Sequence, residues 1–183
     1  MIFCGIDNGS SGSICFMDEN KKVLFLKKTP SKKTEDYNST KKRMVTRIKF
    51  NEMNDVLKFA DFITLERPFK SPMMFDASIS SARANEVTLV IIENNNIEYE
   101  IIDSKVWQHK YFPKKEKGIK QDLKKLSREI GKDMIKYKDK NDNEWKNDYD
   151  AFFIALYSVE KYLENKCNCK TKCKVCKCKE EKE

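Results

Sequence analysis

The chain opens with three short apolar segments separated by turn-forming residues. The segments are residues 2–6, 13–17 and 23–27. Gly5, Gly9 and Gly12 allow tight bends near the first two segments, and residues 18–22 form a polar stretch before the third. Brief apolar runs joined by such turns are typical of antiparallel β-strands. We therefore predict an antiparallel meander at the start of the fold.

A polar stretch, a helical pattern and a short apolar run follow in that order. Residues 30–42 are rich in Lys, Ser and Thr without an apolar period, which predicts an exposed loop that could lie against phosphates. Apolar residues recur at roughly helical spacing over residues 44–59, which predicts a helix. They are Val45, Ile48, Met53, Val56, Leu57 and Phe59. The apolar run 62–65 then predicts a short buried strand that ends at Glu66.

Helical and strand patterns alternate in the second half of the chain. Residues 75–93 fit one helix with a face of small side chains, at Ala77, Ser78, Ser81 and Ala82. Residues 97–102 predict a strand, and we expect Ser104 to cap a short helix that contains Trp107. A strand, a helix and a strand in this order favour parallel pairing of the two strands.

Two more helical patterns complete the chain, on either side of a polar loop at residues 138–146. The first covers residues 114–137, is rich in Lys and is expected to be partly broken at Gly131. Its apolar face carries Ile119, Leu123, Leu126 and Ile130. The second covers residues 150–163 and has an apolar stripe typical of a helix that packs on a sheet. That stripe is Phe152, Ala155, Leu156, Val159 and Leu163.

This order of elements predicts an α/β fold with a mixed five-stranded sheet flanked by helices, which is the order of a ribonuclease H-like fold. A chain of 183 residues is long enough for one domain of ordinary size. We expect that domain to cover residues 1–163, followed by a basic tail rich in Cys and Lys at residues 164–183.

The charge balance favours a polyanionic partner. Lys and Arg number 37 against 29 Asp and Glu, which leaves a formal net charge of +8 and a pI near 9.0. Such a balance is typical of proteins that bind nucleic acid. No stretch approaches the roughly 20 apolar residues that cross a bilayer, and the first residues lack the pattern of a signal peptide. We expect an intracellular, soluble protein without a membrane partner.

Three carboxylates lie at the ends of predicted elements: Asp7 after the first strand, Glu66 after the fourth and Asp150 at the start of the last helix. Hard divalent cations prefer oxygen ligands, and a pair of them can activate a water molecule for attack on a phosphate. Each residue also has a structural explanation. Asp7 could form a turn, Glu66 could pair with Arg67 or a lysine, and Asp150 could cap its helix.

Four short motifs in order resemble the RuvC-like Holliday junction resolvases, including their phage and viral relatives, over most of residues 1–163. The motifs are Gly5-Ile6-Asp7-Asn8-Gly9 with Ser11-Gly12, Leu65-Glu66 with Phe69, Ser81-Ala82-Arg83, and Asp150-Ala151. The resemblance implies a ribonuclease H-like nuclease domain whose carboxylates bind two Mg²⁺ ions, for which Mn²⁺ can substitute. It also implies a homodimer that nicks two strands symmetrically across a four-way junction.

The chain departs from this family at the fourth carboxylate. The family commonly has another Asp about one helical turn before the Asp-Ala pair, where this chain has Asn147. Asp148 lies two residues before Asp150, so on a continuous helix it would point about 200° away. It can join the site only if the helix starts after it, with Asn147 or Asp148 as the natural cap. Asn147 offers only a weak amide ligand.

Basic and aromatic residues supply the predicted DNA contacts. By the resemblance, Lys120 matches a lysine near the scissile phosphate and Phe69 an aromatic residue that stacks on bases. Gln108 stands where the family has another lysine, with Lys105 and Lys110 close by. Arg83, in the third motif, is a further candidate. Solvated surface lysines and a packed loop anchor at Phe69 are the alternatives.

The seven cysteines form two unlike groups. Cys4 and Cys15 lie in apolar strands, where a reduced cysteine acts as a small hydrophobic residue. The tail carries the other five, interleaved with lysines, at Cys167, Cys169, Cys173, Cys176 and Cys178. Four thiolates bind Zn²⁺ tetrahedrally, but the spacing lacks the two separated Cys-x₂-Cys pairs of a zinc ribbon or finger. A small zinc knuckle, a loose soft-metal site and a disordered basic tail remain open.

The leading hypothesis is a Mg²⁺-dependent, structure-selective DNA endonuclease that resolves four-way or other branched DNA by paired nicks. A non-catalytic branched-DNA-binding protein is the first alternative, because the usual fourth Asp is absent. The second is a phosphotransferase of the actin-like group, since the glycine-rich segment 5–12 resembles its phosphate-binding hairpin. The length of the chain argues against the second lobe that such enzymes need.

Overall fold

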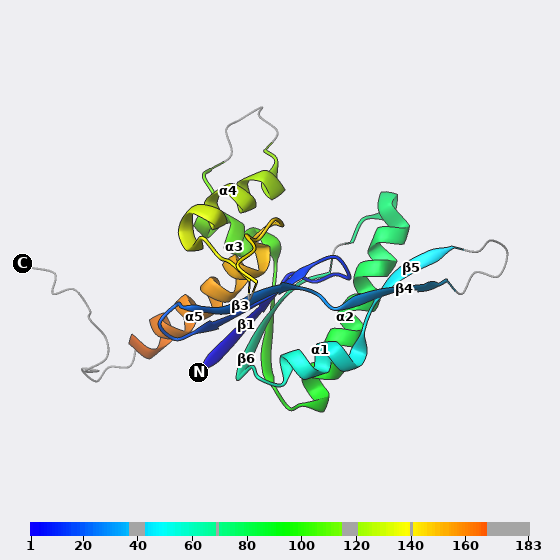
Figure 1. The fold of residues 1–183 in the computed structure, drawn as a ribbon, viewed down its shortest axis with the longest axis horizontal. Coiled ribbons are helices and arrows are strands. Elements are labelled where there is room, and N and C mark those ends of the chain that lie inside the picture. Colours follow the sequence, from blue (N-terminus) through cyan, green and yellow to red (C-terminus); the bar gives the residue numbers. More distant parts are fainter. Residues whose placement is uncertain (37–42, 69, 115–120, 140, 168–183) are drawn as a thin grey trace, which may run out of the picture.

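A computed structural model describes residues 1–36, 43–68, 70–114, 121–139 and 141–167. Its main sheet has five strands in the order β3-β2-β1-β6-β7 (Figure 1). These strands are β1 (Ile2–Ile6), β2 (Ser13–Asp18), β3 (Val23–Lys28), β6 (Phe62–Glu66) and β7 (Glu98–Ile102). The pairs β1·β2 and β2·β3 are antiparallel, whereas β1·β6 and β6·β7 are parallel. The predicted mixed five-stranded sheet, with its opening meander, is confirmed.

Helices cover both faces of this sheet. Helix α5 (Asp150–Cys167) lies on one face, and α1 (Phe50–Leu57) and α2 (Phe75–Asn94) lie on the other (Figure 1). Successive side chains of a strand point to opposite faces, so β1 contributes Phe3 to the core under α5 and Cys4 to the core under α1 and α2. Cys4 and Cys15 are free and fully buried, as predicted.

Gly5 allows α5 to lie unusually close to β1. A Cβ atom at this position would lie 2.3 Å from the backbone nitrogen of Ala155 and 2.4 Å from the carbonyl oxygen of Ala151. The small side chains of Ala151 and Ala155 are themselves fully buried in the same contact. This close approach brings the first residue of α5 next to the end of β1, where Asp7 follows.

Two shorter helices lie beside the start of α5. Helix α3 (Ser104–Tyr111) anchors itself through Trp107, whose ring stacks on Phe153 with 5.9 Å between centroids. Its N-cap is Asp103, whose side chain accepts from the Lys105 N–H, so the predicted cap at Ser104 is wrong by one residue. Asp103 lies outside the helix and can turn its carboxylate back to the free N–H groups of the first turn.

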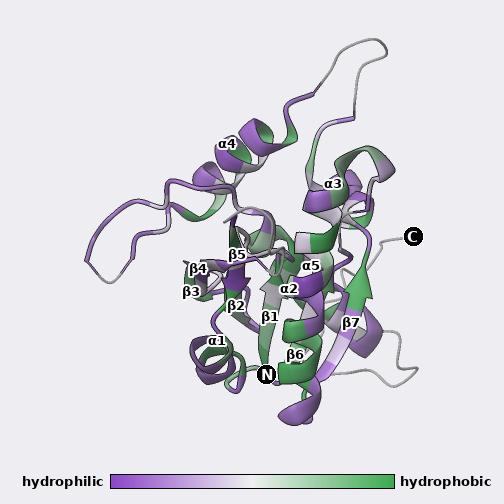
Figure 2. Cartoon of the chain, turned by 90° about the vertical axis from the view of Figure 1, so that its right-hand side faces the viewer, coloured by the Kyte–Doolittle hydropathy of each residue, from purple (hydrophilic) through white to green (hydrophobic). Residues whose placement is uncertain are grey.

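Helix α4 (Leu123–Ile135) continues through Gly131, where the sequence predicted a break. A Cβ at Gly131 would lie 2.3 Å from Cγ of Tyr149, so the glycine permits a close contact between α4 and the residue before α5. Leu126 and Ile130 pack on the core as predicted, whereas Leu123 is exposed. Hydrophilic and hydrophobic residues are interspersed along α4 (Figure 2).

The prediction was wrong for the segment that follows β3. It forms a hairpin of β4 (Ser31–Glu35) and β5 (Met44–Ile48), and α1 begins only at Phe50. Ion pairs between Arg43 and Asp76 at 2.8 Å and between Arg83 and Asp36 at 3.6 Å join this hairpin to α2. Polar side chains cover most of the hairpin, so its strands lack the apolar alternation from which strands are recognised.

The short 3₁₀ helix η1 (Pro72–Met74) leads from the loop after β6 into α2. In β7, the hydropathy changes from hydrophilic at Glu98 to hydrophobic at Ile102, where the strand reaches the interior (Figure 2). Within the described part of the chain, no helix combines the length and apolar character that a membrane span needs.

Candidate metal centre

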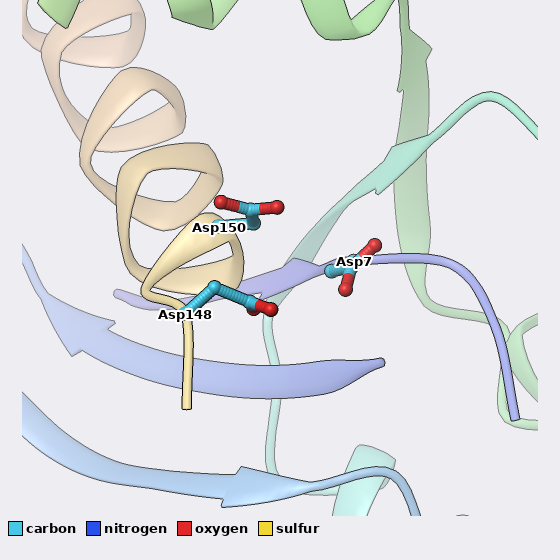
Figure 3. Close-up of side chains that lie close together, drawn as sticks. All are labelled: Asp7, Asp148 and Asp150. Atoms are coloured by element: carbon cyan, nitrogen blue, oxygen red, sulfur yellow. The ribbon is translucent and has the colours of Figure 1, made fainter. Parts of the chain in front are cut away.

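Asp7, Asp148 and Asp150 converge where β1 ends and α5 begins (Figure 3). One carboxylate oxygen from each lies within 4.8 Å of the others. All three side chains are partly buried. Oxygen donors at this spacing fit a hard divalent cation such as Mg²⁺, which binds proteins through carboxylates and retained water molecules.

Asp148 joins this cluster because α5 begins after it. The helix starts at Asp150, and the Phe153 N–H donates to the Tyr149 carbonyl at 3.1 Å, so Tyr149 takes the place of the cap. The expected late helix start is confirmed, whereas the expected cap at Asn147 or Asp148 is wrong. The Trp145 indole donates to the Asp148 carbonyl at 2.7 Å, which helps to hold this non-helical segment. Asn147 is partly buried just before it.

Glu66 approaches the cluster from β6. The parallel register places Leu65 beside Ile6, so Glu66 and Asp7 leave adjacent strands at the same edge of the sheet. The Trp107 indole donates to Glu66 Oε2 at 3.2 Å. Arg67, the partner suggested by the sequence, instead lies 3.9 Å from Asp103. Glu66 stands outside the group of three within 4.8 Å, but the charges of Asp7 and Asp150 act on its carboxylate.

Burial and mutual repulsion make the ionised state of these carboxylates unfavourable. Burial, then Asp150 and Asp148, raise the pKa of Asp7 to about 7. Burial, then Asp7 and Asp150, raise the pKa of Glu66 to about 8. Burial raises the pKa of Asp150 to about 6, with a smaller contribution from Asp148. A bound cation would remove this repulsion, so the donor set and its electrostatics both fit a divalent ion.

Helix α4 adds two side chains that the sequence analysis missed. Lys124 Nζ lies 3.6 Å from Asp148 Oδ2, and its charge lowers the pKa of both Asp7 and Asp150. Ser127 is fully buried and hydrogen-bonds to the Asp150 carboxylate. These residues and Gly131 recur at helical spacing on the face turned to α5, but nothing in the sequence alone says which face that is.

The predicted DNA-contact residues lie apart from the carboxylates where the structure describes them. Arg83 pairs with Asp36 beside the β4–β5 hairpin. Lys110 lies 2.9 Å from Glu160 and 3.4 Å from Glu164 on α5. Lys105 lines a groove of ≈ 560 Å³ together with Gln108, His109 and Lys114. Phe69, Lys120 and the cysteines from Cys169 to Cys178 lie outside the described residues, and Cys167 is the last residue of α5.

The fold, in contrast to the sequence, has clear counterparts among known proteins. No family model and no curated protein sequence matches this chain. The structure is similar to Thermus thermophilus RuvC solved in complex with a Holliday junction substrate, with a TM-score of 0.54 and 13% identity over 90% of this chain and 96% of that one. It is also similar to another Thermus thermophilus RuvC structure, with a TM-score of 0.51 and 11% identity over 90% of this chain and 97% of that one. The chain therefore has the ribonuclease H-like fold of the RuvC Holliday junction resolvases.

Proposed function

We propose that this protein is a Mg²⁺-dependent endonuclease that cleaves branched DNA, with the four-way junction as its main substrate. The convergence of Asp7, Asp148 and Asp150 at one edge of a RuvC-like sheet, with Glu66 on the adjacent strand, carries the proposal. Two further observations support it. A structural neighbour was solved with a Holliday junction substrate, and the chain has a formal net charge of +8.

Asp7, Glu66, Asp148 and Asp150 would hold two Mg²⁺ ions, with Asn147 as a weak additional ligand. Such ions, when bound, lower the pKa of a water molecule and neutralise charge that develops on the leaving oxygen. The Trp107 hydrogen bond orients Glu66, and the burial of the site strengthens each charge–charge interaction inside it. In-line attack of water on the phosphate would leave 5′-phosphate and 3′-hydroxyl ends.

A cleavage assay tests this proposal directly. Labelled four-way junction, flap and linear duplex are incubated with Mg²⁺, with Mn²⁺ or with a chelator. Paired, symmetric nicks in the junction that require metal are the expected result. Asp7→Asn should reduce nicking by about 10³-fold or more and preserve junction binding, because it removes a metal-binding charge and keeps the shape of the side chain.

Asp55→Asn is the matched control, because Asp55 is an exposed aspartate on α1 that pairs with the nearby Lys58. It should cleave like the parent protein. An Asp7→Asn protein that nicks the junction at the parental rate would contradict the assignment. Junction binding without any nicking in Mg²⁺ or Mn²⁺ would favour the non-catalytic alternative, but the position of Asp148 inside the cluster supports an enzyme.

The proposal also includes the more specific predictions made from the sequence, on DNA contacts, on the tail and on the dimer. Phe69 and Lys120 would contact the junction, with Lys105, Lys110 and Arg83 on the surrounding surface. Zn²⁺ binding by the tail cysteines stays one of three open hypotheses, and measurement of metal content in the protein and in a Cys173→Ser, Cys176→Ser variant would test it. A homodimer would make the paired nicks, and its mass in solution can be measured by light scattering. The resemblance to phage and viral members of the family and the intracellular location stay predictions.

A further inference from the structure

One face of α4 meets the segment that carries Asp148 and Asp150. Lys124, Ser127 and Gly131 follow one another at the i, i+3 and i+7 positions of this face. Each has its own contact. Lys124 lies against the Asp148 carboxylate, Ser127 lies against Asp150, and Gly131 lies against the Tyr149 ring. Three successive residues of the acidic segment are therefore held by one helix.

The hydroxyl of Ser127 is the central contact of this face. It accepts the backbone N–H of Tyr149 at 2.9 Å and hydrogen-bonds to the Asp150 carboxylate, whose pKa this bond lowers. Ser127 is 0% exposed, so no water competes for these bonds. A serine inside a helix commonly turns its hydroxyl back to its own helix, and alanine would form the helix better. Here the hydroxyl instead bridges to a different element.

We propose that Ser127 is a positioning residue that holds the Asp150 carboxylate in the geometry required for metal binding. The reason lies in the local structure. Asp148 precedes the first turn of α5, and Tyr149 contributes only its carbonyl to the helix hydrogen bonds, so these bonds fix neither Asp148 nor the Tyr149 N–H. A side chain that binds both the Tyr149 N–H and the Asp150 carboxylate fixes the backbone and the ligand together. This inference rests on the proposed metal-dependent function.

Hydrogen-bond partners of metal-binding carboxylates typically change metal affinity by about 10–100-fold when they are removed. We therefore expect Ser127→Ala to weaken Mn²⁺ binding by about 10–100-fold, as measured by calorimetry or by electron paramagnetic resonance of free Mn²⁺. Ser127→Thr retains the hydroxyl and should recover most of the affinity.

Ser158→Ala is the matched control. Ser158 is a buried serine of α5 whose hydroxyl accepts from Thr64 Oγ1 at 2.8 Å, and it lies about 12 Å along the helix from Asp150. Its removal should lower thermal stability to a similar extent but change Mn²⁺ affinity by less than about twofold, because it contacts no residue of the cluster. The metal-free proteins provide a second measurement. Ser127→Ala should lower the unfolding temperature less in an Asp150→Ala background than in the parent protein.

The outcomes separate this inference from the proposed function. If Ser127→Ala binds Mn²⁺ like the parent and the effects of Ser127→Ala and Asp150→Ala on the unfolding temperature add, the positioning role is overturned, and junction cleavage by the parent would still stand. If Ser127→Ala weakens Mn²⁺ binding but the parent cleaves no branched DNA, the positioning role stands and the nuclease proposal fails. A parent protein that binds no Mn²⁺ overturns both.

Discussion

The two halves of the acidic site are held by different kinds of structure. Asp7 and Glu66 follow adjacent parallel strands, so their separation is set by the backbone hydrogen bonds of a buried sheet. Asp148 and Asp150 lie at the start of a helix, where their positions depend on side chains of α4 and on the indole of Trp145. Sheet register cannot be adjusted by single side chains, whereas a helix start can. Single substitutions should therefore change the carboxylate positions in the helix half of the site more readily than those in the strand half.

The largest expected effect comes from separating the two halves. In Gly5→Ala, the new methyl group would meet the backbone of Ala151 and Ala155 at 2.3 to 2.4 Å, and backbone atoms cannot rotate away. We expect a loss of about 3 kcal/mol in unfolding free energy, at the upper end of overpacking effects, and a loss of Mn²⁺ binding as α5 moves from β1. Denaturant unfolding and calorimetry measure the two effects.

Gly9→Ala is the control for this experiment. A Cβ there would meet nothing closer than 3.9 Å, so the unfolding free energy should change by about 0.5 kcal/mol or less. Equal stability of the Gly5→Ala and Gly9→Ala proteins would show that the close packing of α5 on β1 does not hold the two halves together.

An effect of intermediate size is expected in the pH dependence of stability, to which carboxylates from both halves of the acidic site contribute. Burial and mutual repulsion raise the pKa of Asp150, Asp7 and Glu66 to about 6, 7 and 8, above ordinary unfolded values near 4. Between about pH 4 and pH 8 these three groups bind more protons in the folded protein than in the unfolded chain, so their contribution to metal-free stability should fall as pH rises. Asp148 adds to the repulsion, and Lys124 reduces it.

Thermal unfolding in a chelator should therefore show a midpoint that decreases from pH 5 to pH 8, and Mg²⁺ should restore it most at pH 8. Asp7→Asn should flatten the metal-free profile, because one of the three raised pKa values disappears. A metal-free midpoint that rises over this range would contradict the electrostatic account of the site.

The smallest expected effect concerns the helix half alone. Lys124→Gln removes the positive charge that lies 3.6 Å from Asp148. A divalent ion at the site would no longer be repelled by this cation, so Mn²⁺ affinity should increase by a few-fold, limited by the exposure of the lysine to solvent. Titration calorimetry measures the change, and its sign is opposite to that expected for Ser127→Ala.

Lys125→Gln is the neighbouring control, since Lys125 pairs with Glu129 on the outer side of α4. It should leave Mn²⁺ affinity unchanged. Weaker Mn²⁺ binding in Lys124→Gln, with Lys125→Gln unaffected, would mean that the lysine supports the ligand geometry more than its charge opposes the ion.

The strand half of the site was well predicted from the sequence, and the helix half only in part. Residues 2–6 and 62–65 are apolar runs with a carboxylate directly after each, so strand, burial and site residue are all visible in the local pattern. The sequence could only state a condition for Asp148, namely that the helix begins after it. Lys124 and Ser127 carried no signal of their own, because a lysine and a serine on a Lys-rich helix are ordinary surface residues.

The hairpin of β4 and β5 shows why the sequence predicted the wrong elements for residues 30–48. Its side chains are mostly polar, and α2 supplies its ion pairs from a distant part of the chain. The apolar positions Val45 and Ile48 are three apart, so they also fit a helical period and were assigned to the helix that begins only at Phe50. Pairing between strands decided this region, and local periodicity contains no information about pairing.

The sequence by itself determined the α/β order of elements, the buried strands and the carboxylates that end them, because apolar periodicity and turn residues act over short distances along the chain. Only the tertiary structure decided which residues complete the site. The approach of α5 to β1 allowed by Gly5 and the contact of α4 with Tyr149 join segments far apart in sequence. Whether a polar side chain lies at the surface or holds a metal ligand depends on those contacts.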